Sequence, residues 1–286
     1  MVQPADLAAR LASERADILI TEADPVTAPV LEQDLAIIAV TRGDPVNVDL
    51  PAATERGIPV LCTPGRNADA VAELAVALLF AIARHVVAAD REVRAATVYD
   101  CGHLPQVRHR SWELAGKTVG LVGLGAVGRA VQWRLEGLGI RVIACDPKVS
   151  GASHTLDKLL SESDVVSMHV PASAETAGMI GAREFAAMRN GAIYLNTARA
   201  SLHDVDALVS VLSSGQLAGA GLDHFDGEWL DPGHPLAALP SVVLTPHIGG
   251  ATYDTEVNHT TMIVSDLERL LRGERPLHCV NPEVLG

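Results

Sequence analysis

The chain has 286 residues, enough for two domains of ordinary size with a large buried core. Its 22 basic and 35 acidic residues give a formal net charge of −13, which argues against a surface for nucleic acid or an anionic membrane. We therefore expect small molecules or further copies of the chain as partners. The cysteines show no C-x-x-C pair and no paired spacing, so they suggest neither a disulfide framework nor a zinc site and fit a reducing cytoplasm; they are Cys62, Cys101, Cys145 and Cys279.

The first part of the chain alternates helix and strand patterns. The N-terminus lacks a basic start followed by an apolar segment, so it does not read as a secretory signal. A helical pattern over residues 5–15 is followed by three apolar runs that predict strands, at 17–21, 35–40 and 58–62. The loop TRGDPVN follows the second of these strands.

A long apolar helix is predicted over residues 68–89. Glu73 and Arg84 interrupt it, and its uninterrupted stretch is too short to cross a bilayer. We expect it to be buried between domains or subunits. Residues 97–112, with glycine, proline and scattered charges, predict an irregular connector.

Residues 117–146, KTVGLVGLGAVGRAVQWRLEGLGIRVIACD, predict a strand, a glycine turn, a helix and a second strand that ends in an acid. Gly123, Gly125 and Gly128 have the G-x-G-x-x-G spacing, which allows a tight turn, a close backbone approach and close helix–strand packing. The N-terminus of the helix offers free N–H groups to a pyrophosphate. Asp146, 18 residues after Gly128, lies where a carboxylate would accept hydrogen bonds from a ribose diol. An acid there favours NAD over the 2′-phosphorylated cofactor, although Lys148 leaves that second cofactor open.

Strands and helices alternate through the rest of this region. Such alternation predicts a doubly wound parallel sheet. The final helix, about residues 254–272, is long enough to return to the first domain. We expect strands at 117–122, 141–146, 164–170, 191–197, 217–223 and 241–245. The domains that follow from these patterns are a substrate or lid domain over 1–92, completed by 259–286, and an NAD-binding Rossmann domain over 93–258.

Ligands of open α/β sheets bind beyond the carboxyl ends of the strands, so polar residues just after each strand are candidates for chemistry. An arginine, a glutamate and a histidine gather there, and together they would suffice to reduce a carbonyl group with a nicotinamide. His247 can donate the proton to the developing alkoxide. Glu228 can hold the far ring nitrogen of that histidine. Arg199 offers a fork that suits a planar carboxylate.

The sequence resembles the NAD-dependent D-2-hydroxyacid dehydrogenases, a family that includes D-3-phosphoglycerate dehydrogenase. The resemblance runs in family order from about residue 36 almost to the C-terminus. It rests on ATERGIPVLCTPGRNADAVAEL, ELAGKTVGLVGLGAVGR, SDVVSMHVPASAETAGMIGAREFAAM, GAIYLNTARA, GLDHFDGEW and LTPHIGGAT. It implies an α/β fold in which a doubly wound parallel Rossmann sheet is joined by a smaller, flavodoxin-like substrate domain.

The resemblance also implies the site residues. Arg199, Glu228 and His247 match the catalytic positions of the family. Asp223 matches the position that holds the nicotinamide carboxamide. The loop TRGDPVN matches the segment whose backbone N–H groups hold the substrate carboxylate, so the substrate residues are Arg42, Gly43 and Asp44 with Arg199 and His247. The cofactor residues are Gly123, Gly125, Ala126, Val127, Gly128, Asp146, Pro171, Thr176, Thr197, Ala198, Asp223, Gly249 and Gly250.

The chain departs from the family pattern at several places. Ala200 replaces the glycine of NTARG. In the motif GLDVFxxEP, His224 replaces an apolar residue and Trp229 replaces the proline. Asp44 stands where the carboxylate loop often has glycine, and an acid beside an anionic substrate is unfavourable unless it points away or pairs with Arg42. The N-terminal domain is expected to be shortened, by roughly one strand–helix–strand unit, or the chain's start is incomplete.

The leading hypothesis is a cytoplasmic NAD(H)-dependent oxidoreductase that interconverts a small D-2-hydroxy acid and its 2-keto acid, with His247 as acid and base. The family resemblance implies a homodimer formed through the nucleotide domain, and no residue is assigned to a metal. One alternative is an NAD-binding scaffold or sensor with a vestigial dehydrogenase site. It is motivated by the expected shortening of the first domain and by Asp44 and Ala200. A lesser alternative is a reductase for a phosphonate-type 2-oxo substrate.

Overall fold

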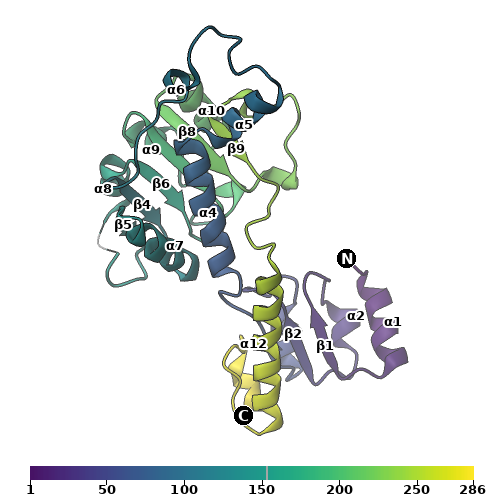
Figure 1. Ribbon diagram of the computed structural model, residues 1–286. Coiled ribbons are helices and arrows are strands. Elements are labelled where there is room, and N and C mark those ends of the chain that lie inside the picture. Colours follow the sequence, from purple (N-terminus) through teal and green to yellow (C-terminus); the bar gives the residue numbers. More distant parts are fainter. Residues whose placement is uncertain (153) are drawn as a thin grey trace. The chain divides into compact units, whose positions relative to one another are not determined.

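A computed structural model describes residues 1–152 and 154–286, and it divides the chain into two compact units. The first unit comprises residues 1–67 and 252–286, and the second comprises residues 68–251 (Figure 1). The order in which the chain builds one unit, then the other, and then returns agrees with the sequence analysis. The breaks fall elsewhere, because the helix that starts at residue 68 packs on the sheet of the second unit and the last helix lies wholly in the first.

The first unit contains a three-stranded parallel sheet in the order β1-β2-β3. The C-terminal segment extends this sheet, since Cys279 pairs antiparallel with Leu61 and the Val280 N–H donates to the Val60 carbonyl. The strands are β1 (Ile18–Thr21), β2 (Ile37–Val40) and β3 (Val60–Leu61). The helices are α1 (Pro4–Glu14), α2 (Ala28–Leu31), α3 (Leu50–Glu55) and α12 (Tyr253–Leu271), with a 3₁₀ turn η3 at Pro282–Leu285.

The long helix α12 joins the C-terminal segment to the sheet of the first unit. Its Ile263 packs against Ala39 and Leu61 in the strands. Buried Asp266 accepts hydrogen bonds from the backbone N–H groups of Leu277 and His278 and pairs with the His278 ring at 2.8 Å. A buried carboxylate that is fully hydrogen-bonded is tolerated, and here it folds the segment after α12 back onto β3.

The second unit contains a six-stranded parallel sheet in the order β5-β4-β6-β7-β8-β9. Most of its strands are buried on both faces, which explains their nearly continuous apolar sequences. The chain adds β5 on one side of β4 and then β6 on the other side. Doubly wound folds bind ligands at such a switch point in strand order. The strands are β4 (Thr118–Val122), β5 (Arg141–Cys145), β6 (Val165–Met168), β7 (Ala192–Asn196), β8 (Leu217–Leu222) and β9 (Val242–Leu244).

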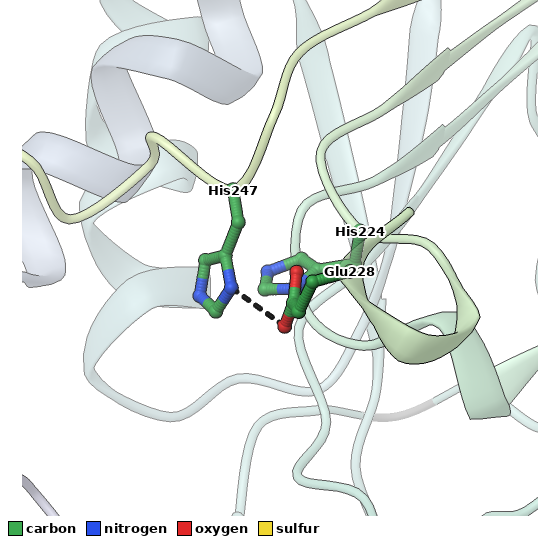
Figure 2. A group of neighbouring side chains, drawn as sticks. All are labelled: His224, Glu228 and His247. Atoms are coloured by element: carbon green, nitrogen blue, oxygen red, sulfur yellow. Dashed lines mark hydrogen bonds and ion pairs between the residues drawn. The ribbon is translucent and has the colours of Figure 1, made fainter. Parts of the chain in front are cut away.

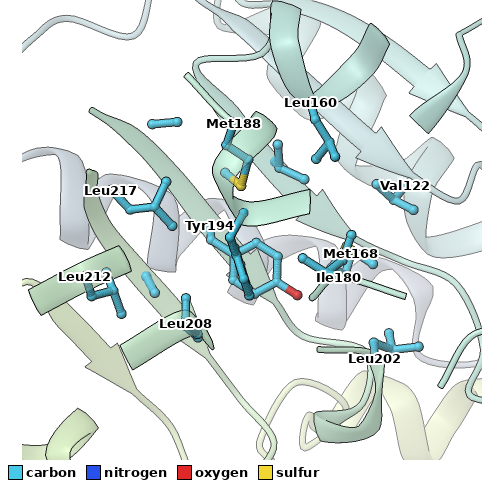
Figure 3. Packing of buried hydrophobic residues seen from close by; sticks show 14 of the residues in the cluster. Val122, Leu160, Met168, Ile180, Met188, Tyr194, Leu202, Leu208, Leu212 and Leu217 are labelled. Atoms are coloured by element: carbon cyan, nitrogen blue, oxygen red, sulfur yellow. The ribbon is translucent and has the colours of Figure 1, made fainter. Parts of the chain in front are cut away.

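Helices cover both faces of this sheet and bury two separate clusters. On one face α4 (Ala68–Ala83) and α7 (Ala126–Gly137) pack together over β4 and β7. The other face carries α8 (Leu156–Glu162), α9 (Ala182–Ala187) and α10 (Val205–Ser213). Fully buried Tyr194 of β7 lies at the centre of that second cluster, as Figure 3 shows. The shorter elements are α5 (Val86–Arg94), α6 (Pro105–Arg108), α11 (Pro235–Ala238), η1 (Ala200–Leu202) and η2 (Asp226–Glu228).

Side-chain caps fix where several helices begin. Thr155, Asp204 and Thr252 each accept a hydrogen bond from backbone N–H groups in the first turn of the helix that follows. These caps satisfy donors that would otherwise have no partner, so the loops that end the strands turn into helices at defined residues.

The helix expected over residues 68–89 is two helices in the structure. His85 takes left-handed backbone angles (φ 54°), and α5 begins beyond it at a bend of 64°. Within the described residues, no single helix has the length and apolarity to cross a membrane, and only the bent pair α4 and α5 passes that test by length and composition. One face of α4 covers the sheet of its own unit, and its burial between domains or subunits stays a prediction.

Candidate active site

The glycine turn lies between β4 and α7 and has the geometry that its spacing predicts. Gly123 has φ +100°, and a Cβ atom there would lie 2.7 Å from the backbone of His169. A Cβ atom on Gly128 would lie 2.3 Å from the Gly123 carbonyl oxygen. The first glycine thus permits the turn, and the third lets helix and strand approach each other.

The start of α7 fits the pyrophosphate of a dinucleotide. Gly125 is the N-cap residue, no side chain caps the helix, and a Cβ atom at Gly125 would meet nothing within 4 Å. The first-turn N–H groups, on Ala126, Val127 and Gly128, therefore receive no side-chain cap, and the helix dipole favours an anion at this end. Chain geometry and charge both suit the expected NAD.

Asp146 follows β5 and contacts the glycine turn directly. Its carboxylate accepts hydrogen bonds from the Leu124 N–H at 2.8 Å and from the Lys148 N–H at 2.9 Å. Each carboxylate oxygen has a second lone pair, so the same group can still accept a ribose hydroxyl. Asp146 thus also orders the turn, a role the sequence does not reveal.

The other predicted cofactor residues follow β6, β7 and β9, and so lie at the same carboxyl edge of the sheet. The Thr176 hydroxyl donates to the Pro171 carbonyl at 2.7 Å and shapes the loop after β6. Thr197 is buried, and its hydroxyl has no partner within the described part of the chain, as expected of a group reserved for a ligand. The remaining predicted residues on these loops are Ala198, Gly249 and Gly250.

His169 supports this edge rather than carrying chemistry, as expected. Its Nε2 lies 2.9 Å from the Ser167 hydroxyl, and burial lowers the pKa of its imidazole to about 4. The backbone of His169 packs against the glycine turn, close to Gly123.

His247 and Glu228 form a hydrogen-bonded pair, with Nδ1 and Oε1 2.8 Å apart (Figure 2). Both residues have left-handed backbone angles, φ 55° and 59°. Asp223 holds the turn that carries His247: its carboxylate accepts from the Thr245 hydroxyl at 2.6 Å and from the N–H groups of Ile248 and Gly249 at 2.9 and 2.8 Å. Asp223, which is predicted to hold the carboxamide, therefore also anchors the turn that carries His247.

Arg199 lies in the loop after β7, and Asn196 shapes that loop. The Asn196 side chain accepts from the N–H groups of Ala198 and Arg199 and donates to the Arg199 carbonyl at 2.8 Å. It also lies 2.9 Å from the His203 ring. The Arg199 side chain is exposed and donates to the Ala198 carbonyl at 2.6 Å, so its fork remains available to a ligand. The sequence did not predict this role for Asn196. The available signal was its place at the end of a strand, three residues before Arg199.

His224 is the residue whose role the sequence analysis left open. It is 5% exposed, its ring centroid lies 3.9 Å from that of His247, and its Nδ1 has no hydrogen-bond partner among the described residues. Burial, with the nearby charges of His247 and Arg199, lowers the pKa of the His224 imidazole to about 4. The structure thus adds a second histidine beside the predicted pair.

The predicted substrate loop belongs to the first unit. Gly43 lies next to Pro64: a Cβ atom on Gly43 would be 3.6 Å from the Cα atom of Pro64. Asp44 is exposed and forms no ion pair with Arg42 among the residues that the structure describes. The Arg66 side chain forms an ion pair with Glu22 at 3.1 Å and lies 2.8 Å from His259 Nδ1. Of the two possibilities for Asp44, the structure thus excludes the pairing with Arg42.

A parallel sheet with a glycine turn at its switch point and an acid after the next strand defines a dinucleotide-binding α/β protein. The family model described as D-isomer specific 2-hydroxyacid dehydrogenase, NAD binding domain, matches residues 76–249. The chain therefore belongs to the D-isomer specific 2-hydroxyacid dehydrogenases and is an NAD-dependent enzyme of that family.

Known proteins are similar along most of the chain. A glyoxylate reductase of Korarchaeum cryptofilum is 40% identical over 92% of this chain and 81% of its own length. A D-3-phosphoglycerate dehydrogenase of Archaeoglobus fulgidus is 36% identical over 92% of this chain and 51% of its own. The NAD-complexed D-isomer specific 2-hydroxyacid dehydrogenase of Lactobacillus delbrueckii ssp. bulgaricus has a TM-score of 0.84 at 27% identity, covering 98% and 90% of the two chains. These similarities confirm the predicted family, fold and cofactor, and they favour an enzyme over a sensor.

Proposed function

We propose that the enzyme reduces a small 2-keto acid to the D-2-hydroxy acid with His247 as proton donor, and that the same residue accepts the proton in reverse. The observation that carries the proposal is the 2.8 Å bond between His247 Nδ1 and Glu228. Since Nδ1 is held, Nε2 is the ring nitrogen left to face a substrate. The Glu228 carboxylate fixes the orientation of the ring by accepting the Nδ1 proton.

When bound, NADH supplies the hydride that reaches the carbonyl carbon. The protein's side chains neutralise the charge that develops on the substrate oxygen and hold the substrate in position. His247 neutralises the alkoxide by giving it the Nε2 proton. Arg199 binds the substrate carboxylate, and its charge also polarises the neighbouring carbonyl. Asp223 and Asn196 keep these two side chains on ordered turns, which reduces the cost of aligning them.

We further propose that loop 41–47 recognises the carboxylate end of the substrate through its backbone. Asp44 disfavours substrates with a second anionic group at that loop, because like charges repel. Small monoanionic keto acids are therefore the first candidates. Glyoxylate heads the list, because the relative from Korarchaeum cryptofilum is named for its reduction.

The test is NADH oxidation with a panel of 2-keto acids. We expect His247→Ala to lower kcat by about 10²–10⁴-fold, the usual contribution of a general acid. Arg199→Ala should mainly raise KM for the keto acid. His103→Ala is the matched control, since this exposed histidine lies in the connector. Unchanged turnover in both site variants would refute the assigned roles.

We also propose a homodimer formed through the second unit. No residue of α5 is buried, and the segment 86–112 exposes several large apolar side chains. Exposed apolar groups that cluster on one segment mark an interaction surface. They are Val86, Val93, Tyr99, Leu104, Val107 and Trp112.

We propose a cytoplasmic location. All four cysteines are free thiols in the structure, which suits a reducing compartment.

A further inference from the structure

Three side chains that can bind a metal converge at the proposed acid–base pair. His224, Glu228 and His247 each offer one ligand atom, and these atoms lie within 4.8 Å of one another (Figure 2). Two of them, His247 Nδ1 and Glu228 Oε1, are 2.8 Å apart. The spacing of these residues does not predict a metal site. His224 and Glu228 belong to the segment after β8, whereas His247 comes from the loop after β9.

His224 is the member that the proposed reaction does not need. It is 95% buried, yet its Nδ1 lacks a hydrogen-bond partner among the described residues. A buried polar atom without a partner is costly, so it suggests a missing ligand. The ring lies against His247, at a centroid distance of 3.9 Å, and packing holds it there.

Two imidazoles and one carboxylate form a donor set used by zinc enzymes, which leave the fourth position open. Tetrahedral zinc with bonds of about 2.0–2.1 Å places its ligand atoms roughly 3.3 Å apart. The His247–Glu228 pair is already near that separation. Small rotations of the two exposed members would bring the group around an ion, while buried His224 stays fixed.

We propose that His224, Glu228 and His247 form a reversible Zn²⁺ site whose occupation stops catalysis. The ion takes the place of the proton between Nδ1 and Oε1, that proton leaves to the solvent, and no redox change is involved. A ring bound to metal through Nδ1 keeps its single proton on Nε2 and can no longer alternate between charged and neutral forms. The binding claim stands on geometry alone, whereas the inhibition claim rests on the proposed function.

Binding is tested first, with the purified tag-free chain and Co²⁺ as a visible probe, followed by Zn²⁺ competition. We expect one high-affinity site per chain in the wild type. His224→Val and Glu228→Gln should each weaken it by about tenfold or more, since each removes a ligand. The matched control is His234→Asn, which removes a half-buried histidine outside the proposed site and keeps an acceptor for the α11 cap.

Equal affinity in the wild type and in both site variants would overturn the site, as would absence of Co²⁺ binding by the wild type. Thermal melting shows whether His224→Val folds. If it does not, Glu228→Gln decides the matter, because Glu228 is exposed and its replacement leaves the core intact.

Inhibition is tested second, by titrating Zn²⁺ into the NADH-linked assay and reversing it with a chelator. Each variant is compared with its own metal-free rate. We expect His224→Val to need at least about tenfold more Zn²⁺ for half-inhibition than the wild type and His234→Asn do. Binding without inhibition would overturn the regulatory claim and leave the site. A chain with no reductase activity would refute the proposed function, and the Co²⁺ spectra would still judge the site.

Discussion

The bond between His247 and Glu228 joins two residues whose backbones are both in the left-handed region. Such a conformation costs roughly 1–3 kcal/mol for a residue other than glycine, and it persists only where its surroundings hold it. For His247 the surroundings are visible, since its N–H donates to the Asp223 carbonyl and the Asp223 carboxylate binds the next two N–H groups. The side chain is thereby aimed at Glu228 before any ligand binds.

Replacement of Glu228 by glutamine tests the pair at the scale of a single residue. We expect kcat for keto acid reduction to fall by about tenfold or more, because the His247 ring loses the charge-assisted hydrogen bond that orients it. KM for NADH should change little. The measurement is steady-state kinetics beside Asp226→Asn, which neutralises a carboxylate of the same turn that does not contact His247. An equal fall in both variants would show that only the charge of the loop matters.

The β4–α7 element owes its geometry to backbone contacts rather than side chains. Gly128 packs on the Gly123 carbonyl, and Asp146 binds the N–H of Leu124 between the first two glycines. The element is therefore a tight unit in which any added atom moves the start of the helix.

Substitution of Gly128 by alanine should separate α7 from the turn, because its Cβ atom would lie 2.3 Å from a carbonyl oxygen that cannot rotate away. We expect NADH affinity to fall by about tenfold or more, as the N–H groups no longer converge on the pyrophosphate. Gly137→Ala is the matched control on the same helix, since its Cβ atom would meet nothing within 4 Å. Fluorescence titration with NADH measures both. Similar affinity in the two variants would contradict the close-approach role.

At the scale of the whole molecule, the second unit buries several histidines in neutral form. Burial lowers the imidazole pKa to about 4 in each of His169, His203 and His224, from 6.5 in an exposed ring. The unfolded chain therefore binds more protons than the folded chain between these values. Stability is fully present above about pH 6.5 and is lost as the pH falls towards 4.

Urea unfolding at a series of pH values between about 7 and 4.5 checks this dependence. His203→Gln keeps an acceptor near Asn196 and removes one titrating group, so we expect its stability to fall less steeply with acid. The exposed His103→Gln should retain the wild-type slope. A slope that is the same in all three proteins would show that carboxylates alone govern acid unfolding.

The homodimer is also a property of the whole molecule. We expect the double variant Val93→Glu and Tyr99→Glu to be a folded monomer, because charges in an apolar interface cannot be buried without partners. Light scattering after size exclusion gives the mass, and circular dichroism checks the fold. Leu271→Glu, which changes an exposed apolar residue of the first unit, should remain dimeric. A monomeric wild type would refute the dimer.

Much of the fold could be predicted from local pattern. All nine described strands lie within the predicted apolar runs, and β4, β6 and β7 show why, because strands buried on both faces have nearly continuous apolar sequences. The break at His85 could not be predicted from the sequence, because the apolar periodicity continues across it. Only the left-handed backbone angles of His85 separate α4 from α5. The unit boundaries were also misplaced, because sequence shows that α4 is apolar but not which sheet it covers.

Residue types at fixed spacings were enough to predict the family, the fold and the cofactor, which the comparisons confirm. The roles of Arg199, Glu228 and His247 stay predictions. The hydrogen bonds by which Asp223 and Asn196 hold the turns of His247 and Arg199, and the contact of buried His224 with His247, became visible only in three dimensions. The physical reason is that hydrogen bonds and ring contacts between loops depend on three-dimensional proximity. Residues distant in the chain meet there because parallel strands bring their carboxyl ends to one edge.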